Sequence, residues 1–162
     1  VSFCDTPGFM VGPEAEETAQ VRHFSRMFVT AGSITVPWLT VVLRKGYGLG
    51  AQAMAGGSFH ATSFTVSWPT GEFGGMGLEG AVRLGFKKEL DAIADPVERK
   101  ALEDKLIASA YERGSALNMA SHMEIDEVID PADTRMRIAG MLRSYPPTPQ
   151  RTGKKRPMID TW

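Results

Sequence analysis

The sequence predicts an α/β domain built around a parallel sheet. Three strand-like runs, at residues 1–4, 38–43 and 64–68, alternate with helix-like segments. The middle run reads WLTVVL, a near-continuous apolar and β-branched stretch of the kind that parallel sheets bury on both faces. Strands that alternate with helices are typical of right-handed β-α-β connections. We therefore expect parallel strands that are joined and covered by helices.

The first elements are placed by their start and stop signals. The strand at 1–4 is followed by Asp5-Thr6-Pro7-Gly8, a turn sequence. Residues 14–30 have an acidic first turn and apolar side chains at helical spacing, which predicts a helix that stops at Gly32. The strand at 38–43 runs into a glycine-containing turn, after which residues 50–55 are expected to form a short helix.

The later elements follow the same logic. Pro69 closes the strand at 64–68, and a glycine-rich loop at 71–77 leads into a helix at 78–86. Asp95-Pro96 predicts the start of a long helix that reaches Met123, because Asp is a good N-cap and Pro a good first helical residue. Asp130-Pro131 predicts a last helix at 132–142 in the same way. We expect the domain to occupy residues 1–145. An exposed tail at 146–162 carries Arg151, Lys154, Lys155 and Arg156.

The composition restricts the function classes. The chain has 162 residues, enough for one domain, and a net charge of −1, which does not indicate nucleic acid or an anionic membrane as a partner. No apolar run reaches the roughly 18 residues that span a bilayer. The single cysteine, Cys4, cannot form an internal disulfide, so we expect a reducing compartment and a small buried thiol. The strand-like opening without Met predicts that the chain begins inside a longer protein.

The segment with the clearest chemical potential is residues 41–54, VVLRKGYGLGAQAM. A buried strand ends, glycines make a turn, and a helix begins, which leaves unpaired N–H groups at the helix N-terminus. Such donors can stabilise an oxyanion, and glycine lets a ligand approach the backbone. Tight packing of helix against strand explains the same glycines equally well, so the residues alone leave both interpretations open.

The side chains offer no convincing catalytic group. His23, His60 and His122 are scattered without the spacing of metal ligands, so we expect no metal site. The Gly-x-Ser-x-Gly signature of serine hydrolases is absent. If the chain is part of an enzyme, backbone amides are expected to supply much of its contribution.

Four blocks occur in a fixed order between residues 3 and 143. Residues 5–9 read DTPGF, 36–48 read VPWLTVVLRKGYG, 68–82 read WPTGEFGGMGLEGAV, and 129–135 read IDPADTR. Together they resemble the β subunits of biotin-dependent acyl-CoA carboxyltransferases. The resemblance implies a crotonase-like fold of repeated ββα units, of which this chain matches the C-terminal domain.

The resemblance implies a reaction and its partners. The family moves CO2 from carboxybiotin to the α-carbon of an acyl-CoA, so biotin on a partner carrier domain is the expected cofactor and acyl-CoA the expected substrate. A biotin carboxyl carrier or biotin carboxylase subunit is the expected partner. The family also implies a dimer-based homo-oligomer, usually a hexamer, in the bacterial cytoplasm or the mitochondrial matrix.

The resemblance also implies a site. The amides of Leu49 and Gly50 would form the biotin-side oxyanion hole, and Gln52 would line the substrate. The residues implied to bind biotin are Pro7, Gly8, Phe9, Gly48 and Ala51. The coenzyme A pocket and a second oxyanion hole would come from the N domain of a partner subunit, so this chain would hold half a site and be inactive alone.

Departures from the family keep other functions open. Common members read YGGAY where this chain has Tyr47-Gly48-Leu49-Gly50-Ala51, so the acyl group and the direction, carboxylation or decarboxylation, are open. A crotonase-type hydratase or isomerase would need a Glu or Asp beside the turn, and residues 46–57 contain none. A non-catalytic assembly domain would instead use a methionine-rich surface at Met54, Met76, Met119 and Met123.

Overall fold

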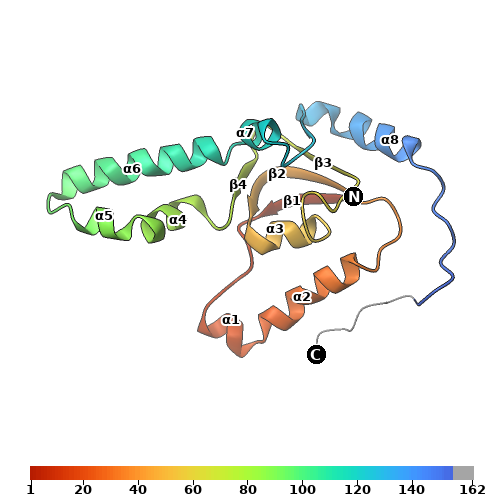
Figure 1. Cartoon of the computed structure of the whole chain (residues 1–162), viewed down its shortest axis with the longest axis horizontal. Helices are drawn as coiled ribbons and strands as arrows, with labels where there is room; N and C mark the ends of the chain where they lie inside the picture. Colours follow the sequence, from red (N-terminus) through yellow and green to blue (C-terminus); the bar gives the residue numbers. More distant parts are fainter. Residues whose placement is uncertain (155–162) are drawn as a thin grey trace.

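The computed structural model describes residues 1–154, and within them a parallel sheet forms the centre (Figure 1). Its strand order is β1 (Ser2–Thr6), β2 (Leu39–Tyr47), β3 (Phe64–Ser67) and β5 (Glu127–Val128), while β4 (Glu72–Gly74) pairs with the far end of β2. All four pairings between these strands are parallel, as the sequence predicts.

The sheet is buried on both faces. Val41 packs with Val66 and Ile129 on one face, whereas the adjacent Val42 packs with Cys4 and other core residues on the opposite face. Successive side chains of a strand point to opposite faces, so this split requires apolar residues at both positions. The continuous apolar run of β2 therefore has a direct structural reason.

Helices cover both faces and form an arm beyond the sheet. On the face of Val42 lie α3 (Gly48–Met54) and α7 (Ala116–Ser121), and on the face of Val41 lies α8 (Thr134–Ser144). The remaining helices are α1 (Pro13–Glu17), α2 (Gln20–Ala31), α4 (Leu78–Gly85), α5 (Lys87–Asp91) and α6 (Pro96–Arg113). Figure 1 shows α4, α5 and α6 projecting to the left of the sheet as a helical arm.

The sequence predicts two long, continuous helices. This prediction is wrong, because the structure interrupts each of them. The helix expected at 14–30 is divided into α1 and α2 by Ala19, which has a left-handed φ of 54°. At the end of α1, the Thr18 hydroxyl lies within hydrogen-bonding distance of the carbonyls of Glu14 and Ala15. The helix expected from Pro96 to Met123 breaks at Gly114, because Ser115 starts α7 by accepting from the Asn118 N–H.

Other boundaries also differ from the sequence prediction. The glycine-rich loop contains β4, and neither β5 nor α5 was predicted. Helix α3 begins at Gly48 rather than at residue 50, and a 3-10 turn (Pro131–Asp133) precedes α8. Residues 146–154 are exposed, as expected for a tail, while Lys155 and Arg156 lie outside the described residues. Across residues 1–154, no helix has the length and apolarity to cross a bilayer.

Candidate functional site

The turn from β2 into α3 opens into a pocket with a volume of about 430 Å³. The pocket is lined by Pro7, Gly8, Phe9, Val11, Phe24, Gly48, Leu49, Gly75, Met76 and Gly77. None of these side chains carries a charge, and four of the positions are glycines. The chemistry that the pocket can present is therefore apolar contact and backbone hydrogen bonding.

The first turn of α3 supplies the backbone donors. Gly48, Leu49 and Gly50 are its first three residues, and N–H groups at these positions have no carbonyl of their own helix to reach. Within residues 1–154, neither the Leu49 nor the Gly50 N–H donates to another backbone carbonyl. The Leu49 side chain is 59% exposed at the pocket wall. The turn thus leaves donors available beside an apolar opening.

Two glycines make the turn possible for different reasons. Gly48 has a φ of 58°, and a Cβ there would lie 2.8 Å from the carbonyl oxygen of Gly75. Gly50 has an ordinary φ, but it is packed directly against the backbone of the loop at Gly8 and Phe9. Only glycine avoids a Cβ at such close approaches. Both residues bring separate parts of the chain together at the pocket.

The loop after β1 is held in place by its own contacts. The Gly8 N–H donates to the Thr6 hydroxyl oxygen at 3.3 Å, which tightens the turn at Pro7. The Phe9 ring stacks on the Phe24 ring of α2, with centroids 3.7 Å apart and planes 4° from parallel. This stack ties the pocket wall to α2, because Phe9 and Phe24 both line the pocket.

A buried tyrosine anchors the residue before the turn. Tyr47 is only 3% exposed, and its hydroxyl donates to Glu72 Oε2 at 2.6 Å. Burial, followed by the hydrogen bond to Glu72, raises the pKa of the Tyr47 phenol well above its usual value. The phenol therefore stays protonated and serves as a donor, not as a base.

Cys4 lies in the core beneath the turn and is not a nucleophile. The residue is fully buried, as the sequence predicts. Burial, with a further contribution from the charge of Asp5, raises the pKa of its thiol to about 11. A thiol with such a pKa remains protonated and unreactive at neutral pH.

The structure brings together most, but not all, of the residues predicted for the site. Pro7, Gly8, Phe9, Gly48 and Leu49 line one pocket, although β1 and α3 are about forty residues apart in the chain. Three predicted residues do not line it: Gly50, Ala51 and Gln52. Ala51 is fully buried in the core, so it supports the turn from behind.

Sequence reasoning missed part of the wall. Val11, Phe24, Gly75, Met76 and Gly77 line the pocket without having been predicted there. The glycine-rich stretch 71–77 was the available signal, since it follows a strand and contains the MG pair of a family block. Phe24 had no signal beyond helical spacing, because its role comes from stacking on Phe9.

The histidines do not form a site. His60 lies 3.3 Å from Glu124 at the surface, and His122 contacts its own helix through the Asn118 carbonyl. Within residues 1–154, no three His, Cys, Asp or Glu side chains gather in a way that could hold a metal ion.

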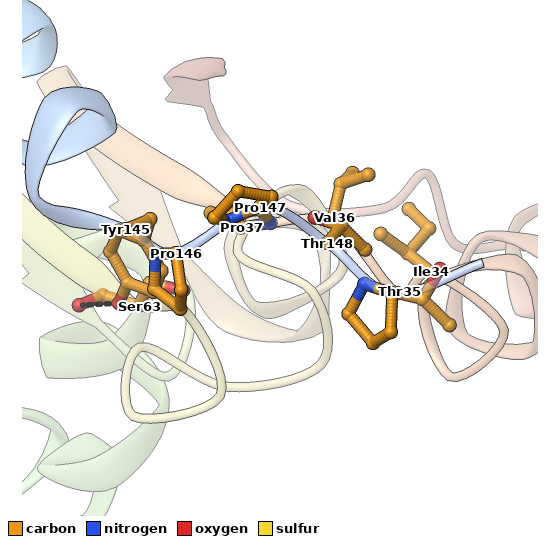
Figure 2. Close-up of a pocket in the computed structure, with 10 residues that line it drawn as sticks. Ile34, Thr35, Val36, Pro37, Ser63, Tyr145, Pro146, Pro147 and Thr148 are labelled. Carbon is orange, nitrogen blue, oxygen red and sulfur yellow. Dashed lines mark hydrogen bonds between the residues drawn. The ribbon is translucent and has the colours of Figure 1, made fainter. Parts of the chain in front are cut away.

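A second pocket lies at the opposite end of the chain (Figure 2). Its volume is about 280 Å³, and it forms where the segment after α8 crosses the connection between α2 and β2. The Tyr145 hydroxyl donates to the Ser63 carbonyl at 3.3 Å, and Pro146 and Pro147 continue past Pro37. No charged side chain lines this pocket. Its contacts attach the segment after α8 to the rest of the domain.

Known proteins resemble the chain over nearly its whole length. A family model described as the carboxyl transferase domain matches residues 1–159. The methylmalonyl-CoA carboxyltransferase 12S subunit of Propionibacterium freudenreichii subsp. shermanii is 37% identical over 145 residues, which cover 90% of this chain and 27% of that subunit.

Solved structures match the fold as well. A single-chain, multi-domain long-chain acyl-CoA carboxylase is 59% identical, with a TM-score of 0.74, over 86% of this chain and 13% of that one. The transcarboxylase 12S hexamer, with methylmalonyl-CoA and methylmalonic acid bound, is 33% identical, with a TM-score of 0.84, over 99% of this chain and 30% of that one. The chain therefore spans at most 30% of the length of these relatives.

Proposed function

This chain belongs to the carboxyl transferase domain family, and from that premise we propose that it forms part of the carboxyltransferase of a biotin-dependent acyl-CoA carboxylase. The observation that carries the proposal is the β2–α3 glycine turn, which presents main-chain donors to an uncharged pocket. A hydratase or isomerase would place a carboxylate beside the donors, and no carboxylate lines this pocket.

The fold agrees with this premise. The expected crotonase-like fold is confirmed by the TM-score of 0.84 with the transcarboxylase 12S structure. Within this fold we assign residues 1–145 to the C-terminal carboxyltransferase domain and residues from 146 to the tail. The coenzyme A pocket and a second set of donors would come from an N-terminal domain of a partner subunit.

The residues at the turn fit a biotin group in size and chemistry. The pocket volume of about 430 Å³ lies in the range of small-molecule sites, roughly 300–1,000 Å³. Pro7, Phe9 and the Leu49 side chain would contact the apolar sulfur-containing ring of biotin, and Gly8 and Gly48 would let its polar ureido ring approach the backbone. Carboxybiotin bound here would supply the CO2 that is transferred to the α-carbon of the acyl-CoA.

The chain's own contribution to the chemistry is electrostatic. The N–H groups of Leu49 and Gly50 would donate to the biotin oxygen that gains negative charge as CO2 leaves. Donors that are already oriented in a site poor in water stabilise such charge without reorganising. Exclusion of water by a bound ligand would strengthen this effect, because hydrogen bonds gain strength where the local dielectric is low. Ala51 would hold the turn from the core, and Gln52 would face the substrate side.

Among acyl-CoAs, the sequence favours a long acyl chain. The long-chain acyl-CoA carboxylase is 59% identical to this chain, whereas the relatives that act on methylmalonyl-CoA are 33% to 37% identical. The higher identity to the long-chain enzyme supports a long-chain acyl-CoA as the proposed substrate.

The proposed partners follow from the same family. The protein would work with a biotin carboxyl carrier and a biotin carboxylase, on one polypeptide or on separate ones. It would assemble as a dimer-based oligomer, as the transcarboxylase 12S hexamer does. The bacterial cytoplasm or the mitochondrial matrix is the compartment that suits these partners.

The test is carboxyl transfer by the protein at its natural length. It is mixed with biotin carboxylase, carrier, ATP and bicarbonate, and then with propionyl-CoA or a long-chain acyl-CoA. We expect carboxylated product, with a higher kcat/KM for the long-chain substrate. Absence of carboxylation of both acyl-CoAs, together with absence of decarboxylation of the corresponding α-carboxylated acyl-CoAs, contradicts the proposed function.

The donor role has its own test. Leu49→Pro removes the N–H at a first-turn position where proline is tolerated, and kcat should fall by about 100- to 1,000-fold. Leu49→Ala keeps the N–H and should retain most of kcat. Equal kcat values for the two variants, both folded by circular dichroism, would exclude the Leu49 amide as the donor.

A further inference from the structure

We propose that Glu72 is a positioning residue for the β2–α3 turn and acts through the Tyr47 hydroxyl. This inference rests on the proposed function, since it concerns the placement of the donors at Leu49 and Gly50. Glu72 lies outside the pocket and does not line it. Its influence on the turn therefore has to pass through the residue that it binds.

The contact sits directly beside the donors. Tyr47 is the last residue of β2 and immediately precedes Gly48, the first residue of α3. Its hydroxyl donates to Glu72 Oε2 at 2.6 Å, the short distance of a hydrogen bond to a charged acceptor. The Tyr111 hydroxyl, which donates to Glu79, lies near the same pair. Within residues 1–154, Glu72 takes part in no ion pair of 4.0 Å or less.

The Tyr47–Glu72 hydrogen bond joins the two strands, β2 and β4, that lead into two segments of the pocket lining. Strand β4 pairs with the end of β2, with Lys45 opposite Glu72 and Tyr47 opposite Gly74. Past these strands, the Gly75 carbonyl lies against Gly48 so closely that a Cβ on Gly48 would clash with it. Gly48 and Gly75 both line the pocket. In the described part of the chain, Tyr47–Glu72 is the one side-chain hydrogen bond that links β2 to β4.

The other edge of β4 is fixed independently. The Phe73 N–H donates to the Gly114 carbonyl at 2.7 Å, and the Ala116 N–H donates to the Gly71 carbonyl at 3.0 Å. These bonds hold β4 on the junction between α6 and α7. Glu72 is thus carried on a strand with a firm support, and it restrains Tyr47 from that support. The Tyr47–Glu72 bond adds to the backbone pairing of β2 with β4 and is expected to resist movement of the turn relative to β4.

The Tyr47 phenol keeps the proton that it donates. Burial and the bond itself raise the pKa of the Tyr47 phenol, so the proton needed for donation is retained. A displacement of about 1 Å in a catalytic group can cost about 100-fold in rate. A restraint one residue away from the donors is therefore expected to appear in kcat.

The experiment compares four variants of the protein at its natural length. Tyr47→Phe and Glu72→Ala each remove one half of the bond, Glu72→Gln keeps an oxygen acceptor, and Tyr145→Phe removes a half-buried hydroxyl far from the pocket. The measurements are kcat and KM for carboxyl transfer, the melting temperature, and hydrogen exchange of the peptide at 47–55.

We expect Tyr47→Phe and Glu72→Ala to lower kcat by about 10- to 100-fold with KM for acyl-CoA unchanged, and to speed exchange in residues 47–55. The double variant should be no slower than either single one, because both act through one bond. Glu72→Gln should restore kcat to within a few fold of the wild type, and Tyr145→Phe should leave it unchanged.

The outcomes separate this inference from the proposed function. If the wild type transfers carboxyl groups and Tyr47→Phe and Glu72→Ala match it in kcat, the positioning role is wrong while the function stands. If the wild type transfers none, the function is wrong, and hydrogen exchange decides the positioning. In that case, unchanged hydrogen exchange of residues 47–55 in both Tyr47→Phe and Glu72→Ala overturns the positioning role of Glu72.

Discussion

Gly50 and Gly8 are packed so closely that a Cβ on Gly50 would lie 2.9 Å from both the Cα and the carbonyl carbon of Gly8. The contact joins the first turn of α3 to the loop after β1, so it sets the distance between two parts of the pocket wall. The glycines of the turn therefore serve tight packing, and this packing places the first turn of α3 beside the loop. The same packing is compatible with the proposed donor role.

Substitution of Gly50 is expected to destabilise the fold. Gly50→Ala forces a methyl group against the Gly8 backbone, and overpacking of this kind costs about 1–3 kcal/mol. Gly140→Ala is the matched control, because Gly140 lies within α8 with no atom within 4 Å of its Cβ position and the change should stabilise by about 0.5–1 kcal/mol. Urea unfolding measures both, and equal stability of Gly50→Ala and the wild type contradicts the packing argument.

Stability should fall in alkali because of Cys4. The pKa of its thiol is raised from 9.0 to about 11 in the folded protein, so the folded state keeps a proton that the unfolded state releases. This contribution is fully present below pH 9.0 and is lost as the pH rises towards 11, by up to about 3 kcal/mol at 1.36 kcal/mol per pKa unit. Unfolding curves at several pH values measure the slope.

Cys4→Ala supplies the comparison for this pH dependence. The variant lacks the thiol, so its stability should decline less steeply between pH 9.0 and about 11, whatever its stability at pH 7. Parallel curves for the two proteins would show that Cys4 is not the group responsible.

The Phe9–Phe24 stack should hold the loop at the pocket. Phe24→Leu keeps an apolar side chain but removes the stacked ring, at an expected cost of about 0.5–1.5 kcal/mol. Hydrogen exchange of the segment 6–12 should accelerate. Phe28→Leu is the control, because Phe28 meets Phe9 only edge-on, with centroids 6.4 Å apart. Similar exchange in both variants would mean that the stack does not restrain the loop.

Asp126 should contribute more to the stability of the fold than its exposed position indicates. Its Oδ2 accepts from the Thr65 N–H at 2.7 Å, while the Asp126 N–H donates to the Thr65 carbonyl at 2.8 Å. Asp126→Ala leaves the N–H of the fully buried Thr65 without its acceptor, at a cost of about 1–3 kcal/mol.

Asp104→Ala is the control for Asp126, since Asp104 forms a surface pair with Lys100 and should change stability little. Thermal and urea unfolding of both variants measure the difference. Equal effects would show that the reciprocal bond between Asp126 and Thr65 adds nothing.

Local signals in the sequence were sufficient for several elements. The apolar run of β2 predicted a strand buried on both faces, and Val41 and Val42 confirm it. The Asp-Pro pairs predicted helix starts, and the Asp95 side chain does accept from the Val97 N–H at 2.9 Å. These features depend on residues next to one another in the chain, so periodicity and capping rules reach them.

Distant contacts decided what those rules missed. Strand β4 has three residues, too few for a periodic signal, and exists because β2 and the Gly114–Ala116 junction bind its two edges. The same junction interrupts the helix that was expected to run from Pro96 to Met123. A short segment adopts the conformation that its partners impose, and those partners are not adjacent in sequence.

The pocket shows the same division. The sequence by itself determined that a buried strand ends in glycines and that a helix follows, with Leu49 between two glycines. The donor role of Leu49 and Gly50 rests on the family resemblance and stays a prediction. Only the tertiary structure decided that this turn faces Gly8 on one side and Gly75 on the other, and that Tyr47 is bound to Glu72. The helical and strand periods of a sequence show which residues one segment buries. A pocket depends instead on the distance between separate segments, and packing across the whole sheet sets that distance.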